Sequence, residues 1–166
     1  MATGMIQEGM GRPEGDELNA DNVSKSLKVP PELQKAYERV VIAGMKVMFD
    51  KQSHVMMLKS LKGPGSLGER LGKGITGLML ILFQESNKTM PPQVLIPAAT
   101  TLLMQAADFI KKAKLEPITN EDIGDGMSIM VTTLLDKFGV TQDKIQKMVN
   151  QYDQTNVKAA SQQMGA

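Results

Sequence analysis

The hydrophobic pattern constrains the fold of this chain more than any other feature of its sequence. Through most of residues 30–155, apolar residues recur at steps of three and four positions, the spacing that places side chains along one face of an α-helix. No stretch alternates apolar and polar residues with period two, and no hairpin turn joins two β-branched runs. The pattern therefore predicts an all-α protein, a bundle of four or five helices.

Proline, glycine and capping residues predict where the first helices begin and end. Pro31 opens a first helix, which either runs unbroken to about Lys62 or breaks near residues 52–54. The sequence leaves both alternatives open. Ser66 with Glu69 three residues later is typical of a capping box, and it predicts a second helix that continues to about Asn87.

Similar signals predict the remaining helices. A third helix follows Pro92 and ends near Lys114, with Pro97 forcing either a late start or a kink. Thr119 with Asp122 caps a fourth helix, which Gly139 ends. A last short helix begins after Thr141 and carries the apolar residues Ile145, Met148, Val149 and Tyr152.

The two ends of the chain are expected to differ from its centre. Residues 1–29 combine four glycines with acidic and amide residues, a composition that buries too little apolar surface to offset chain entropy. We therefore expect a flexible arm over 1–29, one helical domain over 30–155, and a flexible tail over 156–166. The first residues lack the basic and apolar segments of a secretory signal, so none is predicted.

Composition argues against most catalytic and metal chemistry. The chain has no Cys, which removes thiolate nucleophiles, disulfides and cysteine-ligated zinc. His54 is its one histidine, so a multi-histidine metal site is impossible. Glycines 63, 65 and 68 match a dinucleotide fingerprint in spacing, but a predicted helix precedes them where that motif needs a strand. We expect no enzyme activity, no cofactor and no small-molecule substrate.

The glycines at positions 68, 72, 74 and 77 need another explanation, because each costs a helix about 1 kcal/mol relative to Ala. Close contact between helices is the most direct one. Together with the apolar run that follows, they predict an oligomer or membrane face on the second and third helices, and leucine at Gly72 or Gly77 should then disrupt assembly more than helix content. The alternative is a buried core helix. The candidate face comprises Gly68, Gly72, Ile75, Gly77, Leu78, Met79, Leu82, Phe83, Leu102, Ala106 and Phe109.

Charge and methionine content bear on the choice of partner. The net charge of +1 produces no strong field for nucleic acid, although residues 31–116 are basic and both ends are acidic. The 14 methionines suit either helix cores or surfaces that adapt to partners. A helical adaptor or nucleic-acid-binding module that uses the basic middle segment is the alternative function.

As a whole, the chain resembles the small virion structural proteins of tailed bacteriophages, in particular the small internal or ejected proteins of short-tailed phages. The resemblance rests on the glycine-rich start, the Cys-free methionine-rich helices, the glycine-spaced segment 63–83 and the Gln-Met-Gly end. It implies a non-catalytic homo-oligomer located in the virion. It also implies contact with other virion proteins, and with a host envelope in which such proteins form channels during genome delivery. Nucleic acid is not an expected partner.

Overall fold

The computed structural model describes residues 20, 27 and 29–139 of the chain. These residues form helices and turns without strands, so the predicted all-α fold is confirmed. The chain divides into two compact units, residues 1–131 and residues 132–166. The last helix predicted after Thr141, the predicted tail and most of the predicted arm lie outside the described residues.

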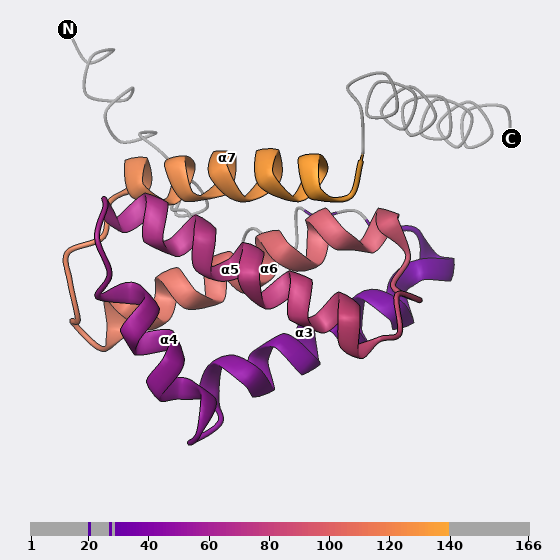
Figure 1. The fold of residues 1–166 in the computed structure, drawn as a ribbon, viewed down its shortest axis with the longest axis horizontal. Coiled ribbons are helices and arrows are strands. Elements are labelled where there is room, and N and C mark those ends of the chain that lie inside the picture. The colour runs from indigo at the N-terminus through magenta and orange to yellow at the C-terminus, as the bar shows by residue number, and fades with distance from the viewer. Residues whose placement is uncertain (1–19, 21–26, 28, 140–166) are drawn as a thin grey trace, which may run out of the picture. The chain divides into compact units, whose positions relative to one another are not determined.

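Five α-helices and one short 3-10 helix make up the described part of the chain (Figure 1). They are η1 (Pro31–Leu33), α3 (Gln34–Phe49), α4 (Ser53–Leu61), α5 (Leu67–Glu85), α6 (Pro92–Lys112) and α7 (Asn120–Lys137).

The capping residues start the helices where the sequence predicts. The Ser66 hydroxyl accepts a hydrogen bond from the Glu69 N–H at 3.2 Å, which satisfies one free donor at the start of α5. At α7 the cap is reciprocal: the Thr119 hydroxyl accepts from the Asp122 N–H, and an Asp122 carboxylate oxygen accepts from the Thr119 N–H at 2.9 Å. Aspartate thus takes the place that glutamate usually has in a capping box.

The structure decides between the two alternatives for the first predicted helix, because α3 and α4 are separate. The backbone of Asp50 is extended, with φ −68° and ψ 142°, and this interrupts the helical ladder. One Asp50 carboxylate oxygen accepts a hydrogen bond from the Gln52 N–H at 3.3 Å, and the Asp50 carbonyl accepts from the His54 N–H at 2.8 Å. These bonds stabilise the turn in which α4 begins.

Helices α5 and α6 end two residues before the predicted positions. Asn87 and Lys88 adopt positive φ angles after α5, and Lys114 does so after α6. The Lys88 N–H then donates to the Phe83 carbonyl at 3.0 Å, and the Leu115 N–H donates to the Ile110 carbonyl at 3.2 Å. These six-residue closures satisfy helix carbonyls without the glycine that sequence signals rely on.

Helix α6 is the central element of the first unit. It packs against α3 and α5, and twelve of its residues are buried. The helix begins at Pro92 and continues through Pro97, so the late start considered from the sequence is wrong. A buried hydrogen bond of 2.7 Å joins the hydroxyls of Tyr37 on α3 and Thr101 on α6.

Glycine also brings α3 close to α6. A Cβ atom added at Gly44 would lie 2.5 Å from the Leu102 Cδ1 atom, so the two helices cross where α3 has no side chain. The core around this crossing is aliphatic and methionine-rich, as the low aromatic content requires. Its fully buried side chains in the first unit are Leu71, Met79, Val94, Leu102, Leu103, Met104, Ile110 and Met130.

In the second unit, the described residues are the end of α7 and the turn that follows it. Gly139 adopts φ 63°, and its N–H donates to the Asp136 carbonyl at 3.2 Å. Helix α7 therefore ends at Lys137, two residues before the glycine that the sequence singles out.

Candidate binding groove

The structure divides the candidate face predicted from the sequence into four environments. Gly68 and Gly72 are buried against α7, and Phe83 and Phe109 are half-buried. Met79, Leu82 and Leu102 are core residues. The remaining four residues line a groove beside α5, namely Ile75, Gly77, Leu78 and Ala106. A role of the eleven residues in an oligomer or membrane contact stays a prediction.

Gly68 and Gly72 make a close helix contact within the chain itself. A Cβ atom at Gly72 would lie 2.5 Å from the Gly126 carbonyl oxygen, and one at Gly68 would lie 2.8 Å from the Asp122 carbonyl oxygen. Gly126 is itself buried there, with the Gly68 carbonyl oxygen 3.0 Å from the position of its missing Cβ. Three glycines thus let α5 and the first part of α7 approach backbone to backbone.

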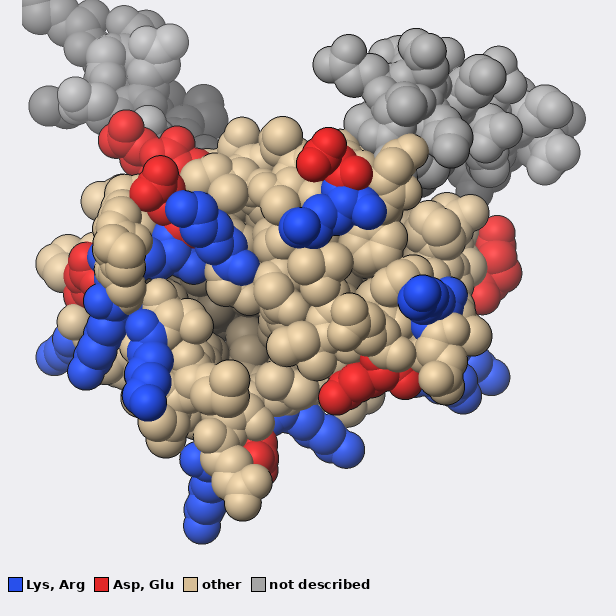
Figure 2. Space-filling view, in the orientation of Figure 1, with Lys and Arg blue, Asp and Glu red and all other residues tan. Residues whose placement is uncertain are grey.

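A groove of about 330 Å³ lies between α4 and α5, with contributions from the end of α3 and from α6. Figure 2 shows the surface hollowed there, with Lys and Arg side chains near its margin. Its volume falls in the range of pockets that hold ligands or short segments of a partner. The lining residues are mostly apolar: Val47, Met48, Ser53, Met56, Met57, Ser60, Leu61, Arg70, Leu71, Lys73, Gly74, Ile75, Gly77, Leu78, Ile81 and Ala106.

The groove is deep at α5 because two of its residues have no side chain. A Cβ atom at Gly74 or at Gly77 would have no heavy atom within 4 Å. Methionines of α4 form one wall, and Met56 is 70% exposed. Ile81, which is 47% exposed, stands at the far end of α5. The groove therefore leaves apolar surface in water that no described part of the chain covers.

The two charged residues that line the groove are both cationic, but only one is available to a partner. Arg70 already has partners within the chain. Its guanidinium donates to the carbonyl oxygens of Leu61 and Ser66 and forms an ion pair of 2.9 Å with Glu116. Lys73 is exposed at the same end of the groove. No carboxylate lines the groove. Its electrostatic preference is therefore for an acidic group near Lys73.

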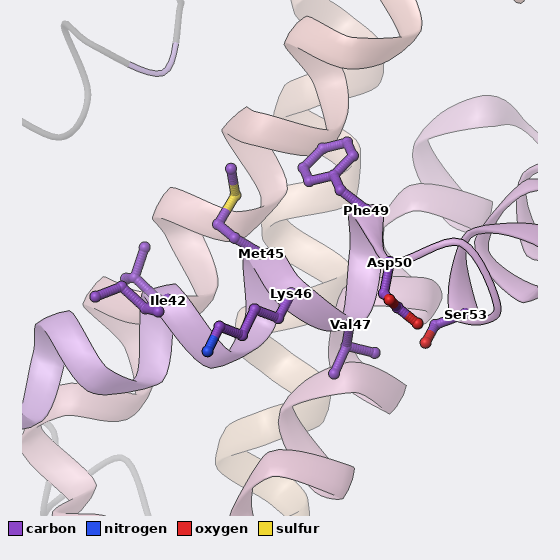
Figure 3. Close-up of a pocket in the computed structure, with 8 residues that line it drawn as sticks. Ile42, Met45, Lys46, Val47, Phe49, Asp50 and Ser53 are labelled. Carbon is purple, nitrogen blue, oxygen red and sulfur yellow. The ribbon is translucent and has the colours of Figure 1, made fainter.

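A second apolar surface lies along α3, beside the groove. Ile42 and Phe49 are 56% and 38% exposed, and with Met45 they line a shallow concavity. Figure 3 shows Met45 and Phe49 extending to one side of α3 and Lys46 and Val47 extending to the other. Glu38 lies one turn before Ile42 and is also exposed. We call Glu38, Ile42, Met45 and Phe49 the α3 face.

His54 lies in a cluster of rings. Its ring centroid is 5.2 Å from that of Phe109, and Phe109 packs edge-on against Phe49 at 5.4 Å. The Nδ1 atom of His54 lies 3.1 Å from the Met48 carbonyl oxygen. The His54 ring therefore lies beside a backbone carbonyl and two aromatic rings. Among residues 20, 27 and 29–139, no three His, Cys, Asp or Glu side chains are grouped to hold a metal ion.

One helix of the described residues, α6, is long and apolar enough to cross a membrane. Its most apolar window is 67% buried inside the structure. The central helix of a water-soluble bundle has the same composition, because it is surrounded by other helices. The hydropathy of α6 is therefore accounted for by its place in the core.

Comparisons of the chain with known protein families, curated proteins and solved structures find no match. The groove and the α3 face are therefore interpreted from their own chemistry.

Sequence reasoning did not select the residues that distinguish the groove from the core. Met56, Met57, Lys73 and Ile81 were outside the candidate face, although all four line the groove. The methionine excess was the available signal, but methionine has the same helical spacing in a core as on a binding surface. Gly74 was recognised as costly without being assigned to a surface.

Proposed function

We propose that this chain is a non-catalytic structural protein that assembles with copies of itself. One observation carries the proposal, namely the concentration of exposed large apolar side chains on α3, α4 and α5. Five of the six such side chains in the described part of the chain belong to these helices: Ile42, Phe49, Val55, Met56 and Ile81. The sixth is Leu115, in the turn after α6.

The number of exposed apolar side chains determines whether they can favour association. Burying one Leu-sized side chain completely contributes ~1.5–3 kcal/mol, whereas loss of translational and rotational freedom on association costs at least about 4 kcal/mol. A single exposed apolar residue therefore cannot hold two proteins together, and scattered ones need no explanation. Four of the five, Ile42, Phe49, Met56 and Ile81, line the α3 face or the groove, and several such side chains buried together favour association.

We assign the assembly to a virion, as an internal or ejected protein that reaches a host envelope. The support is the resemblance of the whole sequence to small proteins of short-tailed phages. The methionine-rich groove is compatible with a surface that adapts to several virion partners. Entry of α6 into a lipid bilayer would require the first unit to open, because α6 is its central helix.

Figure 2 bears on the alternative of a nucleic-acid-binding module. Lys and Arg side chains are interspersed with Asp and Glu side chains on the face it shows, so this face has no continuous basic track. We therefore do not propose nucleic acid as the partner of this face.

The test is the mass of the purified protein in solution, measured by light scattering over a hundredfold range of concentration, with and without liposomes. We expect a defined oligomer at high concentration that Met56→Lys weakens, because Met56 is 70% exposed on α4 and lines the groove. Leu115→Lys is the matched control outside the cluster and should leave the mass unchanged. A monomer at all concentrations would overturn the proposal of assembly. An oligomer that ignores liposomes would overturn the envelope role alone.

A further inference from the structure

The groove and the α3 face have complementary chemistry. The groove is an apolar channel beside a helix with two glycines, and its available charge is the cation Lys73. The α3 face is an apolar stripe that begins with the anion Glu38. At 100° per residue, the four residues of the α3 face fall within about 60° of arc, so they form a single stripe.

The two surfaces also match in length. Glu38 and Phe49 are eleven residues apart on α3, and Arg70 and Ile81 are eleven residues apart on α5. At 1.5 Å per residue, each surface extends about 17 Å, or three helical turns. A helix-in-groove contact typically uses apolar anchors at this repeat.

Glycine determines how near a second helix can come to α5. Gly68 and Gly72 show how closely a helix can pack against such a pair, because the backbone of α7 lies directly against them. The Gly74 and Gly77 pair has nothing within 4 Å of where its Cβ atoms would be. A helix can therefore approach the groove floor as closely as α7 approaches the other side of α5.

We propose that the α3 face of one copy lies in the α4–α5 groove of a second copy, with Glu38 facing Lys73. This inference rests on the proposed homo-oligomeric function and identifies its interface. Ile42 and Met45 lie over Gly74 and Gly77, and Phe49 lies towards Ile81. The Met56 and Met57 side chains, flexible at three bonds, adjust to the ring and the aliphatic side chains.

The contact is head-to-tail, because the two surfaces that meet are different. Each added copy leaves one groove and one α3 face free, so the assembly grows until it closes as a ring, or else continues as a filament. Charge complementarity sets the direction. Lys46, on the flank of α3, would face the cationic groove if the stripe were rotated, which disfavours that arrangement.

A complementation experiment tests the interface. Gly77→Leu fills the groove floor, and it should fold because no heavy atom lies within 4 Å of the new Cβ. Ile42→Lys spoils the α3 face with a cation. Each variant alone should be monomeric at concentrations where the wild type assembles. An equimolar mixture should form dimers of one copy of each, because the first variant keeps its α3 face and the second keeps its groove.

Sedimentation velocity separates the outcomes. Dimers in the mixture, and monomers of each variant alone, are the expected result. If Gly77→Leu assembles like the wild type, the groove is not the interface, and the inference is overturned while the proposed function stands. If each variant is monomeric but the mixture is too, the two surfaces do not meet each other, and the inference is also overturned. A monomeric wild type would overturn the proposed function itself.

The charge pair gives a second, independent reading. Lys73→Glu and Glu38→Lys should each raise the dissociation constant of assembly roughly threefold to tenfold, since the pair is exposed and weak. The double variant should return to near the wild-type value, because the pair is restored with its charges exchanged. Circular dichroism of all three variants verifies that they fold. Effects of the single variants that multiply in the double variant would overturn the pairing.

Discussion

Two pairs of glycines on one helix differ completely in their surroundings. Gly68 and Gly72 lie so close to the α7 backbone that a Cβ atom at either position would overlap it. Around Gly74 and Gly77, no heavy atom lies within 4 Å of where a Cβ atom would be. At 100° per residue the two pairs occupy opposite sides of α5. Glycines in the same helix can therefore have different structural roles. The first pair is required by the fold, and the second pair is tolerated by it at a cost in helix stability.

The largest effect should come from filling the first pair, where the sequence alone predicts a loss of assembly and the structure predicts a loss of stability. Gly72→Leu should lower the free energy of unfolding by at least about 3 kcal/mol, because its Cβ alone would lie 2.5 Å from the Gly126 carbonyl oxygen, a backbone atom that cannot rotate away. Gly77→Leu is the matched control with the same chemical change. Urea denaturation of both variants provides the measurement, and equal midpoints would show that the two sides of α5 are not different.

An intermediate effect is expected at the end of the groove, where Arg70 and Lys73 carry the same charge. Arg70→Met should cost about 2 kcal/mol, because Arg70 is 12% exposed and its guanidinium binds two backbone carbonyls and Glu116. Lys73→Met should change stability by less than about 0.5 kcal/mol, since Lys73 is exposed. Thermal unfolding distinguishes them. Similar losses in both variants would contradict the assignment of Arg70 to the fold and Lys73 to the surface.

The smallest effect should have the opposite sign. Gly74→Ala and Gly77→Ala should each raise stability by about 0.5–1 kcal/mol, since alanine favours the helix and its methyl group meets nothing. For a domain of this size, each kcal/mol of added stability raises Tm by roughly 2–4 °C. Calorimetry at dilution, where the protein is monomeric, measures the intrinsic change. A fall in Tm would mean that the space beside α5 is occupied.

Local signals in the sequence were good guides to the helices. Ser66 and Thr119 cap α5 and α7 as predicted, because a capping hydroxyl acts on N–H groups two or three residues away. The ends of α5 and α6 were predicted two residues late, because Asn87 and Lys114 adopt positive φ without being glycine. The break between α3 and α4 remained open, since Asp50 is compatible with a helix or a cap.

The candidate face was harder to predict. The sequence correctly marked α5 as a helix with unusual glycines, and close helix contact explains Gly68 and Gly72. It assigned Gly68, Gly72 and Gly77 to one face, whereas the structure places Gly77 beside the groove with Gly74, Met56 and Lys73. No local signal relates α4 to α5 in space. Which methionines are buried and which are exposed depends on that relation.

By itself, the sequence of this protein determined that the described chain is helical, because hydrophobic spacing and helix caps act over a few residues. It also excluded cysteine chemistry and multi-histidine sites through composition alone. Only the tertiary structure decided which glycines support the fold and which leave a groove. That decision depends on backbone atoms such as the Gly126 carbonyl, which is more than fifty residues from Gly72 along the chain and 2.5 Å from its missing Cβ in space.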